Sequence, residues 1–384
     1  PNTLAAAPGV VAVLAKPDGS KFYVVSASTT DTLLVMDGSL STVLRRVNLS
    51  QPATAAALSP DGKRLLVLAG GLHVFNTTTA NDDEITLNPV PDVGLNPNDV
   101  AVSIDSRRAF IISDTSDQFT VFDLTTNLVT GSQLTFTGVL TGIAVAPSGL
   151  VYVSGTNRLY EVDPYSGNKR GEIGLNATPA KPVFTPDGKY AVLASTNPVQ
   201  YNDGVAILVD LQTRSKAGTI PASGPNLSVK IDHLTVVDNT RLFAVSTNNQ
   251  RLVRVNLEPF EMQTGGYPLD TRTGVLAARA TGELPGAKYL FVATANTMSR
   301  IVIASSQAAD LTLPKMPKRL AASGPPSTAT PMGFQKFNDG QSVVGGSTTL
   351  PLVVQIWDAN GIPVFNRAVQ FSTTFPGVTI ETAN

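Results

Sequence analysis

A turn signature recurs along the chain at nearly regular intervals. It consists of an apolar run, then Pro-Asp-Gly or a variant of it, then a second apolar run. With the middle turn residue as marker, the copies fall at positions 18, 61, 105, 148, 187, 238 and 285, in steps of 43, 44, 43, 39, 51 and 47. A period of about 40 to 50 residues with strand-like content is typical of a β-propeller blade. The clear copies are Lys16–Gly19, Ser59–Gly62 and Thr185–Gly188.

Each repeat unit predicts four antiparallel strands. Proline presets φ at the first central turn position, aspartate bonds its own backbone, and glycine accepts a positive φ, so the signature joins two strands. The first strand precedes the turn, as in 54–59, and the second follows it, as in 64–69. A third strand ends in Asp or Asn, as in 33–37 and 206–210, and a fourth follows a polar turn, as in 43–49. β-Branched residues dominate and helical periodicity is absent, which indicates an all-β fold.

The repeat predicts a ring rather than a row of sheets. One blade cannot bury both of its faces alone, whereas radial packing buries them and leaves only short edges. Seven units over residues 1–313 therefore predict a seven-bladed β-propeller. Residues Thr3 to Ala5 stand where a fourth strand would end, just ahead of the first blade, so we expect them to close the ring.

The strand sequences also resemble a known repeat family. The segments Phe22–Ser26 and Thr32–Asp37, followed by Val43-Leu44, resemble the YVTN-type repeat of seven-bladed propellers, and Val151–Gly155 and Phe243–Asn248 echo it. The resemblance covers roughly residues 8–313. Surface-layer proteins, lactonase-like enzymes and secreted binding proteins all share such repeats, so the resemblance implies a fold and leaves the function open.

The amino-acid composition changes after residue 313. Residues 314–331 are rich in Pro, Ser and Ala, a linker composition. Residues 332–384 hold a valine-rich strand, the turn Asp358-Ala359-Asn360-Gly361, and a strand ending in Phe371-Ser372. This pattern resembles the invasin-type bacterial Ig-like domains (group 1). A complete Ig-type sandwich needs about 90 to 100 residues, so we expect this one to be incomplete.

Composition excludes several classes of site. The chain has no cysteine, which excludes disulfides, a cysteine nucleophile and thiolate metal sites. Two histidines are too few for a three-histidine metal centre. Charged residues make up 15% and the net charge is −1, so we expect no nucleic-acid partner. No apolar run approaches the length of a membrane span. We also expect neither a metal nor a cofactor.

The most favoured binding region is a long loop between the second and third strands of the fifth unit. It places an aromatic side chain among amides, on the face opposite the Pro-Asp-Gly turns, and extended loops on a rigid ring commonly bind ligands. An unknown protein or glycan is the expected ligand. The candidate residues are Asn197, Gln200, Tyr201, Asn202 and Asp203.

Three first-strand residues are candidates for lining the central channel: Asp232, His233 and Arg279. A hydrolase of the lactonase-like class would need acid–base side chains that converge there. His73 falls in a third strand away from the axis, and we expect a structural or solvent-facing histidine. We expect the acidic run Asn81–Glu84 to be a solvated loop, because it lacks the spacing of a calcium loop.

The pairing of propeller repeats with an Ig-like segment favours a secreted or cell-surface bacterial protein without enzymatic activity. In this interpretation the propeller recognises a ligand or acts as a scaffold, and the Ig-like domain is a spacer. The alternatives are a lactonase-like hydrolase at the channel mouth and a subunit of a surface-layer-type assembly. We expect a monomer, or a member of such an assembly.

Overall fold

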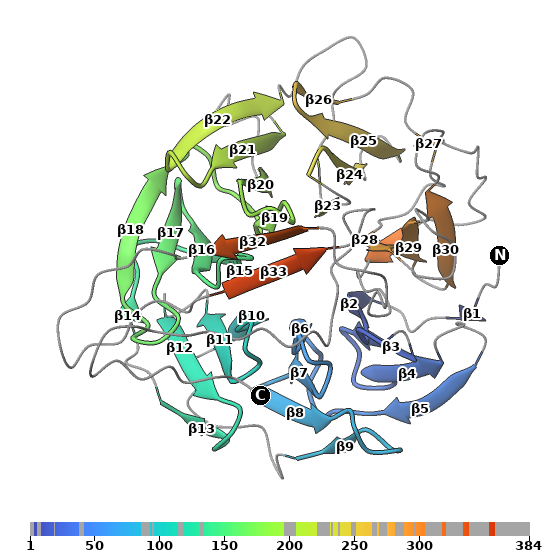
Figure 1. Ribbon diagram of the computed structural model, residues 1–384. Coiled ribbons are helices and arrows are strands. Elements are labelled where there is room, and N and C mark those ends of the chain that lie inside the picture. Colours follow the sequence, from blue (N-terminus) through green and yellow to red (C-terminus); the bar gives the residue numbers. More distant parts are fainter. Residues whose placement is uncertain are drawn as a thin grey trace.

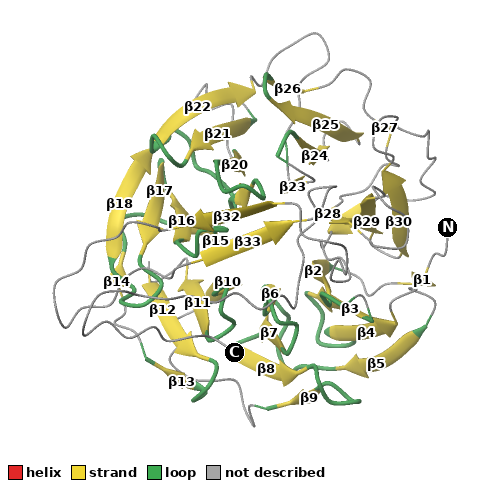
Figure 2. Cartoon of the chain, viewed as in Figure 1, coloured by secondary structure: helices red, strands yellow, loops and turns green. Residues whose placement is uncertain are grey.

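The computed structural model is an all-β ring of antiparallel sheets (Figures 1 and 2). It describes residues 4–5, 9–18, 20–37, 42–85, 93, 96–113, 118–130, 134–195, 205–220, 231, 233–236, 239–246, 251–262, 267–268, 275–280, 288–294, 297–303, 317–319, 333–337 and 353–357. Among these residues no helix is long and apolar enough to cross a membrane.

Six four-stranded sheets, named blades 1 to 6 in chain order, make up most of the ring. Blade 1 holds β2 (Val10–Ala15), β3 (Lys21–Ser26), β4 (Leu33–Asp37) and β5 (Val43–Val47). Blade 2 holds β6 (Ala55–Leu58), β7 (Arg64–Leu68), β8 (Leu72–Asn76) and β9 (Asp83–Glu84). Blade 3 holds β10 (Pro97–Val102), β11 (Arg108–Ser113), β12 (Gln118–Asp123) and β13 (Leu128–Val129), with β14 (Leu134–Thr135) also paired to β12.

Blades 4 to 6 continue the pattern. Blade 4 holds β15 (Leu140–Val145), β16 (Val151–Gly155), β17 (Arg158–Val162) and β18 (Lys169–Gly174). Blade 5 holds β19 (Val183–Phe184), β20 (Tyr190–Ala194), β21 (Ala206–Asp210) and β22 (Ser215–Ile220). Blade 6 holds β23 (His233–Val236), β24 (Arg241–Ser246), β25 (Arg251–Leu257) and β26 (Phe260–Met262), with β27 (Tyr267–Pro268) also paired to β25.

A further sheet joins the two ends of the ring. It orders β28 (Val275–Ala280), β29 (Lys288–Thr294), β30 (Thr297–Ile303) and β1 (Leu4–Ala5), and β31 (Pro317–Arg319) pairs with β29. The predicted closing strand is confirmed, because Leu4 lies opposite Met298 and Ala5 opposite Thr297. Separately, β32 (Gly333–Phe337) pairs with β33 (Val353–Trp357) as an antiparallel hairpin.

The first strand of each blade lies nearest the centre of the ring and the fourth lies at the rim (Figure 1). Alternation along each strand then directs neighbouring side chains to opposite blades. In β7, Leu65 packs against blade 1 and Leu66 against blade 3. Five buried clusters each join two consecutive blades, from the pair 1–2 to the pair 5–6. Each fully buried Leu or Phe in them stabilises the fold by about 1.5–3 kcal/mol.

The repeated turn has the predicted chemistry. In blade 2, Oδ1 of Asp61 accepts a hydrogen bond from the backbone N–H of Lys63 (3.0 Å), and Gly62 has φ of 69°. Asp18, Asp105 and Asp187 accept the equivalent bond two residues on. These aspartates are therefore turn-forming residues.

Candidate functional site

A charged cluster lies near the start of the innermost strands of blades 3, 4 and 5. Asp99 of β10 is 8% exposed. Its Oδ1 accepts from Nζ of Lys181 (2.7 Å) and from the backbone N–H of Val100 (2.9 Å), and its Oδ2 accepts from the N–H of Ile143 in β15 (2.9 Å). Because Lys181 precedes β19, one carboxylate connects blades 3, 4 and 5.

The close packing of backbones makes this arrangement possible. Gly142 in β15 has no side chain where Lys181 passes, and a Cβ built there would lie 2.4 Å from the Cα of Lys181. Nearby, Nδ2 of Asn98 donates to the carbonyl of Leu140 (3.1 Å), while its Oδ1 is buried and has no hydrogen-bond partner among the described residues. The ring thus places a buried carboxylate and a half-exposed lysine between the innermost strands of blades 3, 4 and 5.

The residues predicted from the sequence fall in different places. Residues 196–204, which contain all five candidate loop residues, and Asp232 lie outside the described residues. His233 begins β23, is half-buried, and lies opposite Val245. Arg279 lies in β28 opposite Tyr289, and its side chain is outside the described part. The strands β23 and β28 pack against each other, so His233 and Arg279 stand on neighbouring inner strands.

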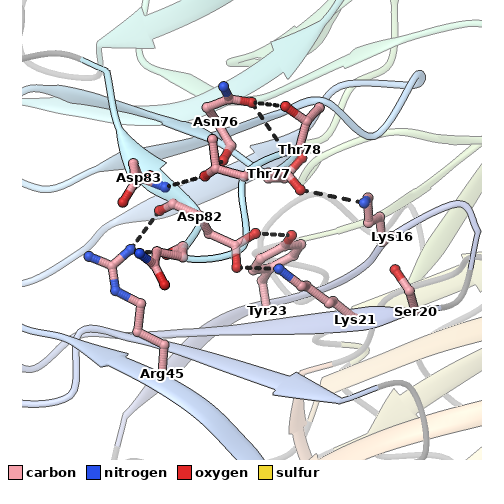
Figure 3. A network of polar contacts seen from close by, with 12 residues as sticks. Lys16, Ser20, Lys21, Tyr23, Arg45, Asn76, Thr77, Thr78, Asp82 and Asp83 are labelled. Carbon is pink, nitrogen blue, oxygen red and sulfur yellow. Dashed lines mark hydrogen bonds and ion pairs between the residues drawn. The ribbon is translucent and has the colours of Figure 1, made fainter.

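The expectation for the acidic run Asn81–Glu84 was wrong at its second residue. Asp82 is 2% exposed rather than solvated. It reaches from blade 2 onto blade 1, where its carboxylate accepts from Nζ of Lys21 (2.7 Å) and from the hydroxyl of Tyr23 (2.9 Å) (Figure 3). Arg45 of β5 donates to the carbonyls of Asn81 and Asp82. Burial, and next to it the negative charge of Asp82, raise the pKa of Tyr23, so the phenol stays protonated as a donor.

The same kind of contact recurs between blades 4 and 5. The turn between β15 and β16 in blade 4 is one residue shorter than its counterparts, since the N–H of Ala146 bonds the carbonyl of Leu150 four positions on, whereas the N–H of Ser59 bonds that of Arg64 five positions on. Tyr152 consequently faces the following blade, as Tyr23 does. Its hydroxyl contacts Glu161 (3.3 Å), which Arg214 of blade 5 reaches at 3.4 Å.

Two further interfaces use the turn between the third and fourth strands. Glu258 of blade 6 accepts from Nζ of Lys189 (2.7 Å) and from the hydroxyl of Tyr190 (2.8 Å) in blade 5. The guanidinium of Arg108 in blade 3 lies 4.8 Å from the ring centre of Tyr165 in blade 4. At four interfaces of the described part, then, this turn of one blade contacts the second or third strand of the preceding blade, or the residue just before its second strand. We call these contacts the blade clamps.

Of the two expected alternatives for His73, structural or solvent-facing, the side chain is buried and bonded. It is 5% exposed, with Nδ1 2.6 Å from Oε1 of Glu84 and Nε2 3.2 Å from the carbonyl of Ala69. Among the described residues no group of three or more His, Asp or Glu side chains could hold a metal ion.

Sequence reasoning did not find Asp99 and Lys181. The only signal for Asp99 was an acidic residue at the start of a strand that is otherwise apolar. Lys181 stands 82 positions further on, and its proximity depends on how three blades pack.

No protein-family model and no curated protein sequence matches this chain. In structure it is similar to a chain of hydrazine synthase from Kuenenia stuttgartiensis, with a TM-score of 0.63 and 15% sequence identity. The match covers 79% of this chain and 98% of that one. At this identity the likeness shows the fold alone, namely repeated four-stranded antiparallel sheets of the propeller type.

Proposed function

We propose that the chain is a seven-bladed propeller that serves as a recognition or scaffold module of a secreted or cell-surface bacterial protein, without enzymatic activity. The six described blades, the seven turn markers and the sheet that joins β28–β30 to β1 support the count. The hairpin of β32 and β33 is compatible with the start of an Ig-like spacer of the invasin type. The YVTN-type repeats support a protein of the cell surface.

The buried carboxylate of Asp99 supports the non-enzymatic part of the proposal. Both oxygens of Asp99 accept hydrogen bonds from groups of the ring itself, namely two backbone N–H groups and the ammonium of Lys181. A substrate could contact this carboxylate only by displacing one of these three donors. The group therefore holds the ring together rather than acting on a substrate.

The polar groups of the blade clamps are likewise bonded within the ring. Their tyrosines and carboxylates are directed at neighbouring blades, so the described polar groups stabilise a rigid platform. A rigid ring positions the loops that emerge from it, and such loops commonly bind ligands. The expected ligand is a protein or glycan bound on the face that carries the candidate loop 196–204.

The test compares hydrolysis with binding on the whole chain. A panel of lactones should be hydrolysed no faster than in buffer, and a glycan array or a pull-down with surface material should give a saturable partner. Hydrolysis above the buffer rate that is lost in Asp99→Asn or His233→Gln, while the melting temperature is kept, would replace the proposal with a lactonase-like hydrolase.

A further inference from the structure

Cations outnumber carboxylates on the outer strands of blades 4 and 5. In β18, the carboxylate of Glu172 pairs with two cations, Arg158 and Lys169, and Nζ of Lys169 lies 3.0 Å from its Oε2. At the rim of blade 1, Arg46 instead pairs with Asp31, one cation with one carboxylate. The side chains of Arg158 and Lys169 are about half exposed, so the positive charge that Glu172 does not balance faces solvent.

A second carboxylate is shared in the same way where the two blades meet. Nε of Arg170 lies 3.8 Å from Oε1 of Glu161, and Nη2 of Arg214 lies 3.4 Å from Oε2. Glu161 is buried, whereas the two arginine side chains are 39% and 45% exposed. A guanidinium has five N–H donors, so both can donate outward while they hold Glu161. We call the four cations the cationic rim: Arg158, Lys169, Arg170 and Arg214.

The cationic rim has a net positive charge in a chain that is almost neutral. Its four cations and two carboxylates leave +2, whereas the whole chain has −1. The nearby carboxylates of Asp163 and Asp210 accept backbone N–H groups of their own turns. The strands β18 and β22 pack side by side along the rim (Figure 1), and Lys216 of β22 is exposed. The positive groups of the two blades therefore lie on one continuous edge.

The backbone at Arg214 is unusual for an arginine. In blades 3, 4 and 5, the residue four positions after the aspartate that ends the third strand has a positive φ. Blades 3 and 4 have Asn127 (58°) and Gly167 (71°) there, the residue types that tolerate this region, whereas blade 5 has Arg214 (54°). A side chain kept at a disfavoured φ points to a role for that side chain.

This backbone carries the guanidinium from blade 5 onto blade 4. Gly171 of β18 has no side chain where the guanidinium passes, and a Cβ built there would overlap Nη2 of Arg214. The side chain therefore lies across the outer strand of the preceding blade and next to Arg170, with which it shares Glu161. Two guanidinium groups are thus held close together on the rim.

The side chains around the cationic rim restrict the class of ligand. Guanidinium groups pair with carboxylates through two parallel hydrogen bonds. Tyr160, the aromatic residue of β17, β18 and β22, is buried, so these strands offer no ring on which the bases of a single-stranded nucleic acid could stack. Strong binding to duplex DNA commonly uses about 6–10 phosphate contacts, more than these cations provide. A polymer with repeated carboxylates fits better.

We propose that the cationic rim binds an acidic polysaccharide, whose carboxylates pair with Arg170 and Arg214. The choice of a polysaccharide rests on the secreted or cell-surface location proposed above. The binding surface itself is a second one, because it uses none of the candidate residues of loop 196–204.

Titration of the whole chain with polygalacturonate, a polymer of uronic acid units, tests the proposal. We expect saturable binding at about 50 mM salt that weakens as the salt concentration rises, since exposed charges are screened. The double variant Arg170→Gln with Arg214→Gly should bind at least about fivefold more weakly. Glycine suits the positive φ at position 214, so the turn is kept. Glu172→Gln removes an anion from the same edge and should bind at least about twofold more tightly.

Arg46→Gln is the matched control, because it removes a rim cation of blade 1, and it should bind like the parent. Melting temperatures show whether each variant is folded, and the gain expected for Glu172→Gln does not depend on a loss of structure. Absence of binding, equal affinity of the parent and the double variant, or equal weakening in Arg46→Gln would overturn the proposal. Duplex DNA bound as tightly as polygalacturonate would overturn the assignment to a polysaccharide. A partner from the glycan array that binds the double variant unchanged would keep the proposed function even if the cationic rim binds nothing.

Discussion

The clamp between blades 1 and 2 can be tested by removing one charge. Asp82→Asn is the appropriate change because Asp82 has φ of 51°, a region that asparagine tolerates. The variant keeps an oxygen acceptor for Tyr23 but removes the negative charge that balances Lys21.

The magnitude follows from burial. The side chain of Asp82 is 2% exposed and that of Lys21 is 17% exposed. Removing one partner of a buried ion pair costs about 3–5 kcal/mol because the other charge is left uncompensated. Lys21 retains some contact with water, so we expect the lower end, about 3 kcal/mol. Tyr23→Phe removes one hydrogen bond to a charged acceptor and should cost about 1.5 kcal/mol.

Urea unfolding monitored by circular dichroism measures these differences. Asp83→Asn is the matched control, since it is the exposed neighbour, and it should change the free energy of unfolding by less than about 0.5 kcal/mol. Lys21→Met combined with Asp82→Asn should cost less than the sum of the two single changes, with a coupling of about 2 kcal/mol. If Asp82→Asn and Asp83→Asn are equally stable, the clamp does not join the blades as described.

Two further predictions concern packing and pH. Gly142→Ala should destabilise the protein by about 1–3 kcal/mol, because the new Cβ would lie 2.4 Å from the Cα of Lys181. Gly174→Ala is the control: a Cβ there would have no atom within 4 Å, so the melting temperature should hardly change. At Asp123 partial burial raises the pKa, but the backbone N–H groups of Thr126 and Thr125 outweigh it, and the net pKa is lowered. Its contribution is therefore complete above the unfolded-state pKa and lost as the pH falls. Asp123→Asn keeps the oxygen that accepts these bonds but does not titrate. Its melting temperature should therefore fall less than that of the parent between about pH 5 and 2.5. An equal fall in both proteins would contradict a contribution of the Asp123 charge to stability.

Much of the fold could be predicted because local chemistry determines it. The strands Leu33–Asp37 and Ala206–Asp210 have the predicted bounds, because an aspartate that begins a turn ends each of them. The aspartate that ends a third strand also has a local role: Asp210 accepts from the N–H groups of Gln212 and Thr213, which begins the following turn.

The polar contacts between blades could not be predicted in this way. Asp82 belongs to a run of acidic residues that looks solvated, and its burial depends on blade 1 packing over it. The pair of Asp99 and Lys181 depends on three strands meeting at the channel, and no local pattern specifies that distance. The short strands β9 and β13 were also not distinguished from full-length ones, because their neighbours carry the same residue types.

The central claim is that the strands at the two ends of the chain's ring pair with each other and close it. Because the chain has no cysteine, two introduced cysteines can report the pairing without background. Leu4 lies directly opposite Met298 in the antiparallel register, a geometry that suits a disulfide. We predict that Leu4→Cys with Met298→Cys cross-links rapidly under mild oxidation, while Leu4→Cys with Val302→Cys, four positions along the same strand, does not. Equal cross-linking of the two pairs, or of neither, would contradict a ring closed by β1.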